Sequence, residues 1–64
     1  MIKREQYDEV YNSIRNGQRQ QAVKQMDEIG MSDLPGMLEY FADDLQDPAL
    51  AIDAAKSYFR VKSR

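Results

Sequence analysis

Apolar residues recur along this chain at the spacing of one face of an α-helix. The first run has the i, i+3, i+4, i+7 pattern and consists of Tyr7, Val10, Tyr11 and Ile14. Asn16 and Gly17 follow it, and both tolerate the left-handed backbone found just past a helix C-terminus. A second run begins almost at once. The short connection predicts that the two helices fold back on each other as an αα-hairpin.

Two further helices are predicted by punctuation and periodicity. Gly30 ends the second helix, and Ser32 or Asp33 then caps a third. The third apolar stripe is the most regular and consists of Leu34, Met37, Leu38, Phe41 and Leu45. Asp47 followed by Pro48 is the strongest break, an N-cap acid before a proline at the first helical position. The fourth stripe consists of Leu50, Ile52, Ala55, Tyr58 and Phe59.

These patterns predict an all-α fold, a compact bundle of three to four short helices built on the αα-hairpin. The helices are expected at 4–15, 18–29, 33–45 and 48–61, within a single helical domain over 1–64 whose last few residues fray. The predicted core comprises Tyr7, Val10, Tyr11, Ile14, Ala22, Val23, Met26, Ile29, Leu34, Leu38, Phe41, Leu45, Ile52, Ala55 and Phe59.

The short length of the chain limits the stability that its core can provide. A chain of 64 residues buries only about 60% of the surface that its unfolded form exposes. Small domains usually add disulfides, a metal or oligomerisation, and this chain has no Cys and no His. We therefore predict a symmetric dimer. Neither a membrane-spanning apolar run nor a signal-peptide core follows Met1, so a cytoplasmic location is expected.

Charge is distributed unevenly along the chain. Residues 1–24 carry five basic and three acidic side chains, 25–53 carry eight acids and no base, and 54–64 carry four bases and no acid. An acidic centre between basic ends indicates complementarity with a partner or within the molecule.

The corner Gly30-Met31-Ser32 resembles the turn of a DNA-binding helix-turn-helix. However, Met26 is bulky where that motif places a small residue, and the following helix has acids but no Arg or Lys. Phosphate contacts and guanine recognition both depend on basic side chains. Nucleic acid is therefore disfavoured as a partner of this helix.

The basic ends leave one alternative open, a weak nucleic-acid-associated accessory protein. Its candidate contacts are Lys3, Arg4, Lys56, Arg60, Lys62 and Arg64. The same bases are also expected from solubility and from the helix dipole, since three of them lie near the end of the fourth helix.

Catalysis is disfavoured by residue type. Asp43, Asp44 and Asp47 have the shape of a magnesium motif, but Asp47 is explained as an N-cap and the other two as a solvent face. Nucleophilic catalysis needs an activated side chain beside a base, and the chain has no Cys, His or Thr. We expect no enzyme activity, no cofactor and no metal.

The stretch NGQRQQAVKQMDEIGMSDLPGMLEYFADDL, together with the chain length, resembles the small early proteins of lambdoid bacteriophages. Those proteins are encoded between the exonuclease and excisionase genes. The resemblance implies an accessory, regulatory role during phage development, exerted through protein contacts in the bacterial host cytoplasm, and it assigns no site residue.

Contact with another protein is therefore the predicted function. Methionines and aromatic residues are common at adaptable interfaces, and acids steer a protein towards a basic surface. The expected contact site for a host protein with a basic surface is the exposed side of the third helix, comprising Met31, Met37, Glu39, Tyr40, Asp43 and Asp44.

Overall fold

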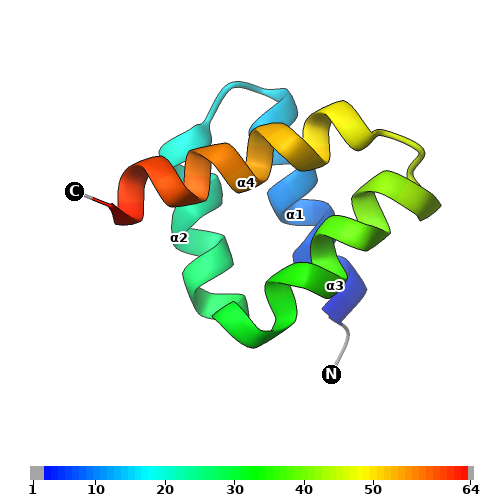
Figure 1. Ribbon diagram of the computed structural model, residues 1–64, viewed down its shortest axis with the longest axis horizontal. Coiled ribbons are helices and arrows are strands. Elements are labelled where there is room, and N and C mark those ends of the chain that lie inside the picture. The colour runs from blue at the N-terminus through cyan, green and yellow to red at the C-terminus, as the bar shows by residue number, and fades with distance from the viewer. Residues whose placement is uncertain (1–2, 64) are drawn as a thin grey trace.

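A computed structural model describes residues 3–63 of the chain. It is all-α, as predicted, with helices α1 (Lys3–Arg15), α2 (Arg19–Ile29), α3 (Leu34–Glu39) and α4 (Pro48–Lys62). A 3-10 turn η1 (Met31–Asp33) precedes α3, and a π-helical turn η2 (Tyr40–Asp44) follows it. Figure 1 shows α4 crossing in front of α1, with α2 and α3 on the other sides of the bundle. α4 runs one residue beyond the predicted end, and Arg64 of the predicted frayed tail lies outside the described residues.

The predicted αα-hairpin is present. Gly17 has φ +79° and its backbone N–H donates to the Ile14 carbonyl at 3.0 Å, so the left-handed residue closes α1. The returning α2 packs against α1, and the buried Ser13 hydroxyl donates to the Gln25 side chain at 3.0 Å. This bond satisfies a polar group that would otherwise weaken the apolar contact between the helices.

The corner between α2 and α3 also forms where the sequence places it. Gly30 has φ +102°, and its N–H donates to the Met26 carbonyl at 3.0 Å. Asp33, one of the two predicted caps, occupies the N-cap position of α3, but its side chain makes no capping hydrogen bond; Pro35 lies in the first turn. The backbone N–H groups of the first turn have no intrahelical acceptor, so a proline at this position removes no hydrogen bond and is tolerated.

The third helix differs from the continuous segment 33–45 that the periodicity predicts. After Glu39 the backbone widens into η2, where the Leu45 N–H donates to the Tyr40 carbonyl at 3.1 Å. Gln46 then takes φ +53°, an uncommon conformation for a residue other than glycine. These local changes end the helix early and turn the chain directly into α4.

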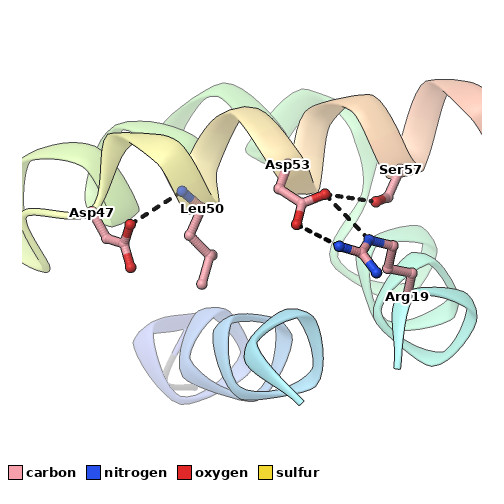
Figure 2. Close-up of polar contacts among 5 residues, drawn as sticks. All are labelled: Arg19, Asp47, Leu50, Asp53 and Ser57. Atoms are coloured by element: carbon pink, nitrogen blue, oxygen red, sulfur yellow. Dashed lines mark hydrogen bonds and ion pairs between the residues drawn. The ribbon is translucent and has the colours of Figure 1, made fainter. Parts of the chain in front are cut away.

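Asp47 begins α4 as predicted. Its Oδ1 accepts the Leu50 N–H at 3.1 Å, and Pro48 stands at the first helical position. Figure 2 shows this cap at the start of the helix. The other carboxylate oxygen accepts the Tyr11 hydroxyl at 3.1 Å, which ties the start of α4 to α1.

One core lies between the four helices and contains most of the predicted residues. Seven of them are buried: Val10, Ile14, Ala22, Val23, Met26, Leu34 and Phe41. Five others are partly buried against these: Tyr7, Tyr11, Ile29, Leu38 and Leu45. Ala55 has intermediate exposure. Buried apolar residues that the prediction left out are Met37, Leu50, Ala51, Ala54 and Tyr58.

The prediction was wrong for the inward face of α4. Ile52 and Phe59 were expected in the core, but 56% and 66% of their surfaces are exposed. α4 carries two apolar stripes, and the one that packs inward contains the small residues Ala51 and Ala54. Small side chains allow closer approach of helix axes, so this face can lie against the bundle while Phe59 stays outside.

Candidate partner-binding surface

The six residues predicted to contact a partner do not form one exposed surface. Met31 in η1 is 66% exposed, whereas Met37 is completely buried. Met37 lies one turn after Leu34 and one turn before Phe41, both core residues, so helical periodicity directs it inward. The expectation that Met37 is exposed was wrong, and no partner can reach this side chain in the folded protein.

Tyr40 is half-buried, and its polar group is already satisfied within the molecule. Its hydroxyl donates to Asp8 Oδ1 at 2.8 Å, and the Arg4 guanidinium carbon lies 5.4 Å from the ring centroid. The hydrogen bond to Asp8, together with burial, raises the pKa of Tyr40 above its usual value. Tyr40 therefore links η2 to α1 through this hydrogen bond, and only part of its ring is accessible to a partner.

The three acids of the predicted site differ in their surroundings. Asp44 lies 3.6 Å from Arg4, in an ion pair between two well-exposed side chains. Glu39 and Asp43 are exposed and make no ion pair with any residue that the structure describes. They stand four residues apart on the outer side of α3 and η2, where nothing within the described chain neutralises them.

The aspartates of the possible magnesium motif have separate roles. Asp47 caps α4 and accepts the Tyr11 hydroxyl, while Asp44 faces Arg4. Burial raises the pKa of Tyr11, and the hydrogen bond to Asp47 raises it further. Within residues 3–63, no three Asp or Glu side chains lie close enough together to hold a metal ion.

Two further ion pairs join the acidic middle of the chain to basic residues. Arg19 donates two hydrogen bonds to Asp53, at 2.9 and 3.2 Å, and Lys62 lies 3.2 Å from Asp27. The paired Arg19 guanidinium holds the pKa of Asp53 below its usual value, and the Ser57 hydroxyl contributes to this effect. Figure 2 shows the Asp53 carboxylate bonded to both partners. Some of the acids in the middle of the chain are therefore neutralised by basic residues of the same molecule.

A basic groove runs between α2 and α4, with a volume of about 680 Å³. Its basic side chains are Arg19, Lys24, Arg60 and Lys62. Two of these are paired with aspartates, which leaves Lys24 and Arg60 exposed and without an ion pair in the described chain. Arg64 and the side chain of Lys3, two of the predicted basic contacts, lie outside the described residues.

An apolar groove of about 170 Å³ lies between α3 and α4 and was not predicted. Met31, Pro35 and Leu38 line one side of it, and Ala55 and Phe59 line the other. The spacing from Ile52 through Ala55 to Phe59 did signal an apolar stripe. That stripe was expected in the core because a single helix with two apolar faces does not reveal which face is covered.

Comparison with models of protein families, with curated proteins and with solved structures finds no match to this chain. No helix among the described residues has both the length and the apolar character needed to cross a membrane. The fold and the surface define a small all-α bundle with an acidic face, a basic groove and an apolar groove.

Proposed function

We propose that this protein is a non-enzymatic protein–protein interaction module, an early accessory or regulatory protein of a lambdoid phage that acts on a host protein in the bacterial cytoplasm. The observation that carries the proposal is the exposed pair Glu39 and Asp43, which no described base neutralises. Of the other predicted contact residues, Met37 is buried, Tyr40 is hydrogen-bonded to Asp8 and Asp44 is paired with Arg4. Unpaired carboxylates on one exposed face favour a basic protein surface.

The acidic face supports a defined mode of action. Its field attracts a basic partner surface and raises the rate of association, most strongly at low ionic strength. Asp44 adds to this field less than its two neighbours, since Arg4 lies 3.6 Å away. Met31 is exposed and flexible, so it can serve as an apolar anchor next to the polar contacts. Basic protein surfaces often bind nucleic acid, and the protein would then act as a competitor of that nucleic acid.

The test is capture of host proteins from nuclease-treated bacterial lysate by the purified protein. The double variant E39K/D43K should lose a partner that the parent captures at low salt. The control E9K/E28K makes the same change in net charge at two other exposed acids, on α1 and α2, and should retain that partner. All three proteins must first give the same circular dichroism spectrum. If folded E39K/D43K retains every partner of the parent, the acidic face is not the binding site.

We also propose that the protein forms a symmetric dimer. The apolar side chains of Met31, Ile52 and Phe59 are largely exposed, and a chain of 64 residues has little core to spare. Sedimentation of the purified protein at micromolar concentration should give about twice the monomer mass. A monomer that persists at millimolar concentration would contradict self-association.

The basic groove favours a second candidate function, weak association with nucleic acid. Lys24 and Arg60 line it and have no ion pair in the described chain. Binding through phosphates would weaken steeply as salt increases. Fluorescence anisotropy with labelled single-stranded DNA and RNA should then detect binding by the parent at low salt and its loss in K24E/R60E. The variant K24Q/R60Q, which removes the charge without reversing it, should be intermediate.

A further inference from the structure

The apolar groove between α3 and α4 belongs to a larger uncovered apolar surface. Phe59, at one side of the groove, is 66% exposed, and Met31, at the other, is exposed to the same extent. Ile52 is 56% exposed and precedes Phe59 by seven residues, so it continues the same face of α4 by two turns. Large side chains exposed next to one another are typical of an interaction site.

The two sides of this surface carry opposite charges. On α3, Glu39 follows the groove residue Pro35 by four residues and therefore lies at the outer rim of the groove. On α4, Lys56 and Arg60 lie one turn apart and border the exposed Phe59. These three charged side chains are exposed and form no ion pair in the described part of the chain. The apolar groove thus has an acidic rim on α3 and a basic rim on α4.

We propose that this surface binds a second copy of the same chain about a two-fold axis that runs along the groove. Such an axis exchanges the two rims, so Glu39 of each copy faces Lys56 and Arg60 of the other. An isologous interface requires a self-complementary surface, and opposite rims around an apolar centre meet that requirement. The inference rests on the proposed self-association and identifies the surface that produces it. Because Glu39 and Met31 belong to this surface and to the proposed host contact, the dimer and the host complex exclude each other.

Phe59 supplies the apolar contact of this arrangement. Each ring enters the groove of the other copy, whose volume of about 170 Å³ resembles the cavity of roughly 150 Å³ that accommodates benzene in an engineered protein core. A stable interface covers about 800 Å² on each partner, roughly a fifth of the 4460 Å² exposed by this chain. The contact must therefore extend from the groove over Ile52 and Met31, the two exposed apolar residues beside it.

The first experiment is sedimentation of purified full-length variants. The substitution F59Q should raise the dimer dissociation constant at least tenfold, because a buried aromatic anchor carries much of the energy of an interface. The matched control is V61Q, since Val61 is 41% exposed on the same helix but lines the basic groove. V61Q should dimerise like the parent, and both variants should retain the helical circular dichroism of the monomer. A dimeric parent whose F59Q variant associates equally well would overturn this surface and leave self-association standing. A strictly monomeric parent would overturn both.

The second experiment tests the orientation by exchanging charges. E39K and K56E/R60E place like charges against each other in their own homodimers, so each should associate at least threefold more weakly than the parent at low salt. An equimolar mixture should form heterodimers, because every facing pair then has opposite signs. If the mixture associates no better than either variant alone, the two-fold arrangement is wrong. Capture of a different protein by the groove in place of a second copy would also overturn it.

Discussion

Two adjacent alanines on α4 provide a direct test of how this helix is packed. Ala54 has no exposed surface, whereas Ala55 has intermediate exposure and lines the apolar groove. Replacing either residue by leucine adds the same atoms and hardly changes helix propensity. Any difference in stability between the two variants therefore reports the space around each position, not the helix itself.

The structure sets the magnitude of each effect. A54L forces three extra carbon atoms into a filled contact, and overpacking of this kind costs about 1–3 kcal/mol. A55L instead fills part of an open groove, so its free energy of unfolding should stay within about 0.5 kcal/mol of the parent value. The total free energy of unfolding of a domain of this size is roughly 3–10 kcal/mol, so A54L should lower the melting temperature by about 5–20 °C.

The assay is urea denaturation followed by circular dichroism, at a concentration where sedimentation gives a monomer for all variants. A49L serves as the exposed control on the same helix and should also lie within about 0.5 kcal/mol of the parent. If A55L is destabilised as much as A54L, or more, the inward face of α4 is the one that the sequence pattern favoured, and the exposed position of Phe59 is wrong.

Three further outcomes follow from individual contacts. Phe41→Ala removes a completely buried ring and should cost about 3–5 kcal/mol by urea denaturation, enough to unfold most of the protein; a parent-like melt would contradict the core. Asp47→Ala should cost about 0.5–2 kcal/mol through loss of the cap on the Leu50 N–H, and Asp47→Ser should recover most of the cap. Because Arg19 lowers the pKa of Asp53 in the folded state, this aspartate stabilises the fold above its unfolded pKa of about 3.9. That contribution is under about 1 kcal/mol for so exposed a pair, and it disappears as pH falls through the folded pKa. In a series of denaturation curves, the difference in stability between the parent and Asp53→Asn should therefore shrink below about pH 4. A difference that grew there would refute the assignment.

The ion pairs narrow the possible roles of the charged residues. Asp27, Asp44 and Asp53 from the acidic middle all have basic partners within the molecule. Each pair is exposed and contributes little stability, but it reduces the charge available to another protein. Of the acids in the predicted contact site, Glu39 and Asp43 have no ion pair in the described chain, and for this reason the proposed host contact depends on them.

Local signals in the sequence determined where the helices begin and end, except at the end of α3, which stops at Glu39 instead of at the predicted residue 45. Gly17 and Gly30 provide left-handed or unusual backbone at two helix ends, and Asp47 provides a cap three residues before the N–H that it binds. These effects involve neighbours in the chain, so they can be read without knowing the fold. Helical periodicity likewise predicted the inward stripes of α1 and α2.

Only the tertiary structure decided which surfaces remain uncovered. The sequence of α4 offers two apolar faces, and the face with Ala51 and Ala54 packs inward because small side chains let the helices approach closely. Phe59 stays exposed on the other face of α4, and local spacing within that helix does not reveal this; Met37, by contrast, follows the regular spacing of the buried residues Leu34 and Phe41. The pairing of Arg19 with Asp53, 34 residues apart, likewise arises only when α2 and α4 meet. Helix ends follow from interactions over a few residues, whereas exposed surfaces depend on long-range packing, and for this protein the candidate binding surfaces are of the second kind.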